Sequence, residues 1–265
     1  MDKFIQRWKP SVKIFLFQVW MMTYSNLKSR YRNTFAGMFW VILGPLIIYG
    51  VQSYIFSKVL WINVPDYSQF LLSGLLAWIF ISQSIDQCTP LLISRAQLLT
   101  AYAVNPVVLI LAQLLDNFIN FLIAFFILLL PVLMYSDSRI RLSGMVVFPL
   151  AAFNLFIGTF GFCWLFSIAN VFFRDTRFIL SFMISVAYYL TPIFYPISMV
   201  PEEMRGLFEL NPFYRLIEPL RISLYFYEPG LFWISMLKGT IVSIPLVISA
   251  AIIWNRRRNA IYLQL

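Results

Sequence analysis

The chain has 265 residues, of which 61% are hydrophobic and 12% are charged, and its mean hydropathy is +0.80. Soluble domains carry about 25% charged residues, so this composition excludes a fully soluble fold and predicts a protein solvated partly by lipid. The chain has no histidine, and its two cysteines lie inside apolar runs. These facts disfavour a disulfide framework and remove the commonest metal ligand. The formal charge of +9 would also suit nucleic-acid binding, a choice that the positions of the charges decide.

The N-terminal stretch is basic and amphipathic and lacks a small-residue cleavage site, so we expect it to be retained. Residues 11–30 mix polar side chains such as Lys13, Gln18 and Lys28 with bulky apolar ones, a pattern typical of a helix in the membrane interface. We therefore predict a first unit over residues 1–33, with a cytoplasmic N-terminus and an amphipathic interface helix. Arg30 and Arg32 stand just before the first long apolar run, where they would lie at headgroup depth.

Six later segments are long and apolar enough to cross a bilayer, which takes about 20 residues for about 30 Å of hydrocarbon. They are residues 35–57, 68–88, 106–134, 145–172, 178–199 and 232–254. Pro192 and Pro196 interrupt the fifth, which we expect to break near one face of the membrane. The sequence thus predicts an all-α integral membrane protein with a six-span transmembrane domain over residues 34–254 and a basic cytoplasmic tail over 255–265.

The positions of the basic residues predict the orientation of these spans. Of the 20 Lys and Arg residues, 13 fall in the N-terminus, the 89–105 loop, the 173–177 turn and the tail. Positive charge marks the cytoplasmic side, so both termini are expected there. The basic character is therefore interpreted as orientation in the cytoplasmic membrane, and no nucleic-acid partner is expected.

The segment 200–231 lies between the last two predicted spans. It carries too many charges to cross a membrane and too many apolar residues for a free loop. Two short helices broken around Asn211 and Pro212 would reconcile these properties, by dipping into the outer leaflet and returning. Pro219 leaves the continuity of the second helix open.

Enzyme signatures are missing from the chain: it has no GxxxxGK[ST] phosphate loop, no GxSxG and no HExxH. Two carboxylates remain within the apolar segments, and such residues are expensive to bury. Asp86 stands near the cytoplasmic end of its span, where water can reach it. Asp116 lies deeper, and both a structural partner on another helix and a role towards a substrate remain open for it.

Aromatic residues are abundant, with 27 Phe, 14 Tyr and 8 Trp. Their rings offer apolar faces to sugar C–H groups and, in Tyr and Trp, polar tips to hydroxyls, so together they would suit a carbohydrate pathway. Membrane packing and interfacial belts remain the alternative for any single ring. The candidate pathway residues are Phe39, Trp40, Tyr49, Tyr54, Trp78, Phe80, Tyr188, Tyr189, Phe194 and Tyr195.

Four stretches carry a resemblance to a known family. They are LKSRYRNTFAGMFWVILGPL at 27–46, NPVVL at 105–109, VFFRDTRFIL at 171–180 and TPIFYPISMVPEEMRGLFELNPFYRLIEPLR at 191–221. In these motifs, their order and their spacing, the chain resembles the permease subunit of polysaccharide-exporting ABC transporters, the group that serves O-antigen, teichoic acid and capsule export.

The resemblance implies a non-catalytic subunit without a cofactor of its own, because ATP and magnesium bind to a separate nucleotide-binding subunit. It also implies re-entrant gate helices between spans five and six. The residues that it assigns to ATPase contacts are Ser94, Arg95, Ala96 and Gln97 in one segment and Arg174, Asp175 and Arg177 in another. Those in the gate region are Glu202, Arg205, Asn211, Pro212, Arg215 and Arg221. A local Arg174–Asp175 ion pair that caps helix ends remains an alternative reading of the second contact.

The cargo of this family is usually linked to a lipid, which gives Arg30 and Arg32 a possible partner. An arginine pair at the inner leaflet could attract the phosphate of such a lipid, with plain headgroup anchoring as the alternative. The expected assembly is a homodimer of this chain, with twelve spans in all, bound to two ATPase subunits and in contact with membrane lipids. The expected substrate is a lipid-linked polysaccharide of the O-antigen type, and a capsule or teichoic acid polymer is the alternative.

Three other functions are alternatives to this one. The first is an ABC exporter of a drug or a small lipid, which would belong to the same family but carry a different cargo. A membrane enzyme acting on polyprenyl-phosphate sugars would need paired acids, and Asp86 and Asp116 make a weak pair. An ion channel is disfavoured because no filter-like motif occurs.

Overall fold

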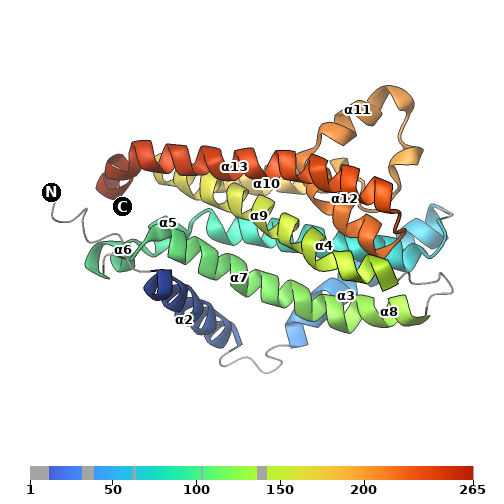
Figure 1. Ribbon diagram of the computed structural model, residues 1–265, viewed down its shortest axis with the longest axis horizontal. Helices are drawn as coiled ribbons and strands as arrows, with labels where there is room; N and C mark the ends of the chain where they lie inside the picture. Colours follow the sequence, from blue (N-terminus) through green and yellow to red (C-terminus); the bar gives the residue numbers. More distant parts are fainter. Residues whose placement is uncertain (1–11, 32–38, 62–63, 103, 136–141, 265) are drawn as a thin grey trace.

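The computed structural model describes residues 12–31, 39–61, 64–102, 104–135 and 142–264. Within these ranges the chain forms helices and no strands, as predicted. The long helices lie side by side in one bundle (Figure 1).

Among the described residues, five helices are long and apolar enough to cross a membrane. They are α3 (Phe39–Tyr54) with the π-helical turn η2 (Ile55–Val59), α4 (Tyr67–Cys88), the continuous α7 (Pro106–Ala124), η3 (Phe125–Leu129) and α8 (Leu130–Tyr135), α9 (Leu142–Phe172), and α13 (Pro229–Gln264). These helices correspond to the first four predicted spans and the last. α13 continues through the residues expected to form a separate basic tail.

The fifth predicted span differs from the expectation. Its helix, α10 (Thr176–Leu190), has 15 residues, so it extends about 22 Å, less than the hydrocarbon thickness of about 30 Å. It stops before Pro192, and the chain continues without regular structure through buried Ile193 and Phe194. The break is as predicted, whereas the count of six spans stays a prediction.

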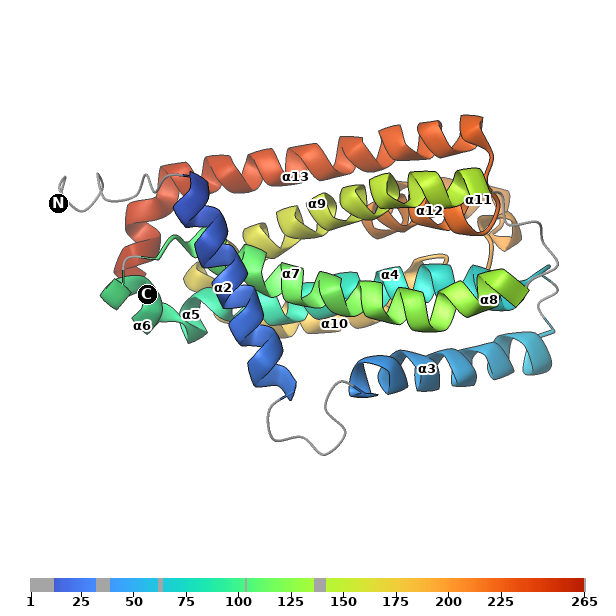
Figure 2. The ribbon, with the colours of Figure 1, turned by 60° about the horizontal axis from the view of Figure 1, so that its bottom comes forward.

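Helix α2 (Val12–Tyr31) crosses one end of the bundle at an angle to the long helices (Figure 2). Val19 of α2 packs with Val104 and Val108 beside the start of α7, while Phe17 and Trp20 stay exposed. This arrangement agrees with the predicted surface helix. The short helices α5 (Leu91–Ser94) and α6 (Ala96–Tyr102) lie at the same end, as does the end of α13.

The opposite end carries two short helices, α11 (Glu202–Leu210) and α12 (Pro212–Leu224), after the 3₁₀ turn η4 (Ile197–Met199). Their break at Asn211 confirms the predicted pair of helices. α11 projects from the bundle, whereas α12 packs against α4, α9 and α13 and buries Leu216, Ile217 and Leu220. α12 runs through Pro219 without stopping.

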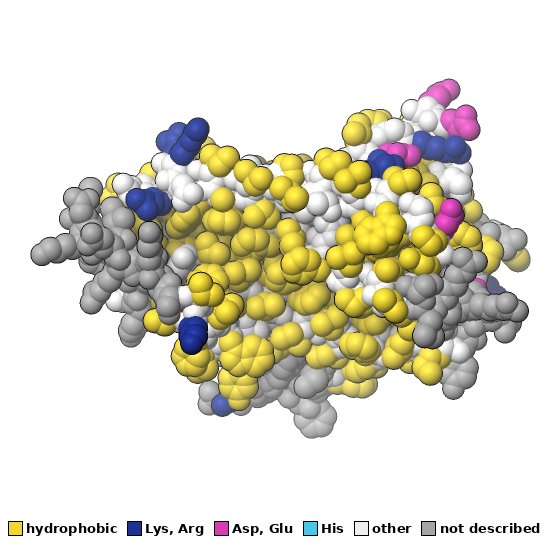
Figure 3. Space-filling view, in the orientation of Figure 1, with side chains coloured by type: hydrophobic (Ala, Val, Ile, Leu, Met, Phe, Trp, Pro, Cys, Tyr) yellow, Lys and Arg dark blue, Asp and Glu magenta, His cyan; other side chains and the backbone are white. Residues whose placement is uncertain are grey.

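The surface of the bundle is apolar along its length. Large side chains such as Phe178, Phe182 and Ile241 are more than half exposed. Figure 3 shows a broad hydrophobic band between charged ends, with Lys and Arg where α13 finishes, and with Asp and Glu beside further Lys and Arg near α11. Exposing so large an apolar surface to water would be energetically unfavourable, so the protein is a multi-pass membrane protein.

Candidate functional site

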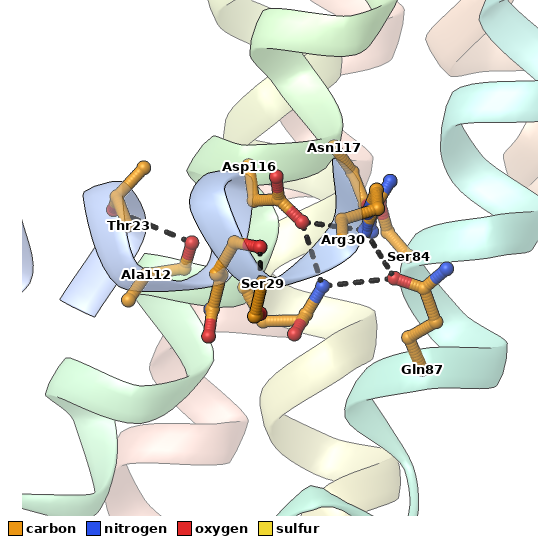
Figure 4. Close-up of polar contacts among 10 residues, drawn as sticks. Thr23, Ser29, Arg30, Ser84, Gln87, Ala112, Asp116 and Asn117 are labelled. Atoms are coloured by element: carbon orange, nitrogen blue, oxygen red, sulfur yellow. Dashed lines mark hydrogen bonds and ion pairs between the residues drawn. The ribbon is translucent and has the colours of Figure 1, made fainter. Parts of the chain in front are cut away.

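A polar cluster joins the surface helix α2 to α4 and α7 (Figure 4). Arg30 Nη2 lies 2.5 Å from Asp116 Oδ2. The same nitrogen donates to Asn117 Oδ1 at 2.9 Å and to Gln87 Oε1 at 3.1 Å. Gln113 Nε2 donates to Gln87 Oε1 at 2.8 Å and to Asp116 Oδ2 at 3.3 Å, which closes the network.

The helical period of α7 explains why the cluster forms. Gln113, Asp116 and Asn117 are spaced i, i+3 and i+4, so they share one face of the helix. That face meets α4, where Ser84 Oγ accepts from Asn117 Nδ2 at 3.3 Å. Thr23 of α2 donates to the carbonyl of Ala112 at 3.4 Å, which adds a second contact between α2 and α7.

The electrostatics of the cluster centre on a buried carboxylate. Asp116 keeps 1% of its side-chain surface exposed, whereas Arg30 keeps 28%. A buried carboxylate is costly unless it is paired and hydrogen-bonded, and Arg30 supplies the charge that compensates for Asp116. The structural partner considered for Asp116 is thus present, on another helix. Asp86, by contrast, is exposed.

Sequence reasoning identified the two charged members of this cluster but not its amides. Only the acidic residues of the apolar segments were singled out. Gln87, Gln113 and Asn117 are also polar side chains inside apolar segments, so the same criterion would have found them. Arg30, for which a lipid phosphate and plain headgroup anchoring were both left open, forms an ion pair with Asp116 in the structure. Neither alternative is tested by this pair. Arg32 lies outside the described residues.

The predicted ATPase contacts lie at the end of the bundle that carries α2. Ser94, Arg95 and Gln97 are exposed around the junction of α5 and α6, and Ala96 is half-buried. Arg174, Asp175 and Arg177 are exposed where α9 turns into α10. α5 packs against α9, and Ser167 of α9 donates to the Cys88 carbonyl at 2.6 Å, so the two segments are held together. Within the described chain, Arg174 and Asp175 form no ion pair.

The predicted pathway rings divide by exposure. Exposed are Phe39, Trp40, Tyr54 and Tyr189; half-buried are Tyr49, Tyr188 and Tyr195; buried are Trp78, Phe80 and Phe194.

Tyr188 brings several of these rings together. Its ring centroid lies 5.6 Å from that of Trp78 and 4.7 Å from that of Phe194. Phe80 packs elsewhere, between α4 and α7, at 5.5 Å from Phe118. The single chain therefore gathers some of the predicted rings and separates others, and their role in a pathway stays a prediction.

The residues predicted to form the gate region hold α11 and α12 in place, and their role as a gate stays a prediction. Asn211 caps α12, and its Oδ1 accepts from Phe213 N at 2.9 Å. Arg215 bridges Glu209 of α11 at 3.0 Å and Glu218 of α12 at 3.3 Å. Pro212 is the first residue of α12, and Arg205 pairs with Glu202 on exposed α11 at 3.4 Å.

Arg221 supports the unwound segment after α10. It donates to the carbonyls of Pro192 at 2.6 Å and Ile193 at 3.2 Å, and its guanidinium lies 4.2 Å from the centroid of the Phe70 ring. Irregular backbone within a membrane needs such partners, and sequence analysis did not assign this role to Arg221.

Comparison with known proteins assigns the chain to a family. The family model described as ABC-2 type transporter matches residues 17–225. The chain is 29% identical over 197 residues to the O-antigen export system permease protein RfbA of Klebsiella pneumoniae, covering 74% of this chain and 76% of that protein. It is 28% identical over 237 residues to the Myxococcus xanthus protein of the same name, covering 88% and 90%.

A third relative has a different named cargo. The chain is 23% identical over 200 residues to the polysialic acid transport protein KpsM of Escherichia coli, covering 73% of this chain and 75% of that protein. The apolar helical bundle fits these membrane relatives, and the family match spans most of its helices. The chain therefore belongs to the ABC-2 type transporter family.

Proposed function

We propose that this chain is the permease subunit of an ABC transporter that exports a lipid-linked polysaccharide, of the O-antigen type, across the cytoplasmic membrane. Two copies of the chain would enclose the pathway, and two copies of a separate ATPase subunit would bind beneath them. The observation that carries the proposal is the similarity to a named O-antigen export permease over 88% of this chain.

The geometry of the bundle supports the coupling part of the proposal. Arg95 and Arg174 are exposed in two turns at the end of the bundle that α2 crosses. A partner that changes shape can move membrane helices only by docking on such turns. Because this end also gathers Lys and Arg, we place it, with both chain termini, in the cytoplasm.

A second cargo within the same class is favoured by one observation. The similarity to KpsM supports a capsule-type polymer as the alternative to O-antigen. Both cargoes are polysaccharides, so the same ATPase subunit and the same energy source, ATP hydrolysis, would drive the export of either one.

The test is co-purification with a candidate ABC-type ATPase subunit from the same organism, followed by measurement of ATP hydrolysis by the complex in the presence of lipid-linked glycan. We expect a stable complex whose hydrolysis rises with the glycan. The double charge reversal Arg174→Glu and Arg177→Glu should abolish the complex, whereas Lys58→Glu, exposed near the opposite end of α3, should leave it intact. A complex that survives the double reversal contradicts the assigned contact, and no binding to the unaltered chain contradicts the proposed function.

A further inference from the structure

A groove of about 470 Å³ opens between α3, α4 and α7, beside the end of α2. Its walls change character along its length. Arg30, Gln83, Gln87, Asn117 and Asn120 line one part. The other part is apolar and is lined by Ile48, Leu76 and Ala124 among others. The groove is thus polar towards α2 and apolar deeper in the bundle.

The groove has the length of one leaflet. From Gln87 to Leu76, α4 advances about 16 Å at 1.5 Å per residue, roughly half of the hydrocarbon thickness. α3 forms one wall of the groove, and Pro45 is its only buried residue. Little of the rest of the described chain therefore packs against α3 on this side of the groove. A groove of this length and polarity fits a lipid of the leaflet next to α2, with its headgroup at the arginine.

Arg30, at the polar end of the groove, is held in place by only one of its three guanidinium nitrogens. Arg30 bonds Asp116, Asn117 and Gln87 through Nη2 alone. Within the described chain, its Nη1 and Nε make no hydrogen bond or ion pair, and 28% of the side chain is exposed. A guanidinium held by one edge presents its remaining N–H groups to an anion, and phosphate is a suitable acceptor.

Asp116 gives this site a counter-ion of its own. The pair carries no net charge, so a phosphate must compete with the carboxylate for Arg30. The competition limits binding of anions in general and favours a ligand that also makes hydrogen bonds to the amides nearby.

Gly44 provides the room on the α3 side of the groove. It lines the cavity, and a Cβ placed on it would meet nothing within 4 Å. The Cβ of a larger side chain at this position would therefore meet open space at the wall of the groove. Gly50, on the same helix and outside the groove, has equally open surroundings.

We propose that this groove binds the phosphate-bearing lipid anchor of the exported glycan. The phosphate accepts hydrogen bonds from Arg30, the amides of Gln83, Gln87 and Asn117 bond the adjoining sugar, and the tail follows the apolar wall. The site lies within one copy of the chain, and the assignment of its ligand rests on the proposed function.

The experiment measures binding of a fluorescent polyprenyl diphosphate to the full chain in phosphatidylcholine nanodiscs, without ATP. Loss of a charge-assisted hydrogen bond should make binding to Arg30→Gln about tenfold weaker. Asp116→Asn should bind severalfold more tightly, because the competing carboxylate is gone. Gly44→Leu should bind about tenfold more weakly, because its side chain occupies the volume of the tail.

The controls separate ligand binding from stability. Gly50→Leu and the exposed Lys28→Gln should bind as the unaltered chain does. An unlabelled polyprenyl alcohol should compete poorly, as should inorganic diphosphate, because each lacks half of the ligand. Size-exclusion elution and helical circular dichroism check that each variant is folded.

The proposal is overturned if Gly44→Leu binds normally, or if Arg30→Gln and Asp116→Asn weaken binding equally, as a purely structural pair would. Equal competition by phosphatidylglycerol would assign the groove to bulk anionic lipid and also overturns the proposal. Because the assay needs neither ATP nor the partner, its failure leaves export by the complex intact. Normal binding without export would contradict the proposed function alone.

Discussion

Single side chains stabilise the irregular parts of this membrane protein, and Arg221 is the clearest case. Its guanidinium satisfies two carbonyls of the unwound segment after α10, and it stacks on Phe70. Gly74 of α4 leaves the space that the guanidinium occupies. The break after α10 therefore depends on a charged residue and a glycine from two other helices.

The change Gly74→Ala tests this dependence. A Cβ at Gly74 would overlap Arg221 Nη2, which cannot move without losing its carbonyl partners. We expect a lower free energy of unfolding by about 1–3 kcal/mol, the usual cost of overpacking, measured by thermal melting in detergent. Gly206→Ala is the control, because a Cβ there meets nothing within 4 Å and helix propensity favours alanine. Equal melting of Gly74→Ala and the unaltered chain would contradict the role of Arg221.

At this scale the sequence predicted which residues are unusual but not how they pair. Arg30 and Asp116 both stood out as charges at or within apolar segments, yet they lie 86 positions apart in the chain. Their pairing depends on how α2 crosses α7, which local periodicity does not encode. The same holds for Arg221, which the resemblance placed only in the gate region.

Among the elements, α12 shows how local signals and tertiary packing combine. Asn211 and Pro212 are a typical helix start, with a side-chain cap and a proline at the first position. Asn211 Nδ2 also donates to Thr191 Oγ1 at 3.0 Å, so the cap ties α12 to the unwound segment. Burial of one face then carries the helix through Pro219.

Removing this cap should loosen the start of α12. Asn211→Ala loses the acceptor for Phe213 N and should cost about 1 kcal/mol, seen as faster hydrogen exchange in the first turn. Asn211→Asp keeps the acceptor, so the first turn should stay protected in that variant. Unchanged exchange in Asn211→Ala would show that packing alone holds the start of the helix.

The positions of the long helices were predictable because each is a continuous apolar run. α10 was the exception, since the apolar run around Pro192 outlasts the helix. Proline predicted that break, but the buried course of the segment beyond it depends on Tyr67, which donates to the Phe194 carbonyl at 3.1 Å, and on Arg221. Such support from other helices cannot be read from the segment itself.

On the scale of the whole molecule, the two ends of the bundle differ. One end carries α2, the exposed turns at Arg95 and Arg174, and the polar part of the groove. The other carries α11 and α12 with their acidic residues. This asymmetry fits the proposed function, in which the ATPase subunit and the cargo bind at one end of the bundle and the cargo leaves at the other.

The most direct test of export uses proteoliposomes that hold this chain and its ATPase subunit, with the ATPase facing outward. A lipid-linked glycan is added to the outer leaflet, and its protection from an added glycosidase is followed. We predict that protection grows only when both proteins and ATP are present. Protection by the chain alone without ATP, or ATP hydrolysis by the complex without any protection of the glycan, would contradict the account.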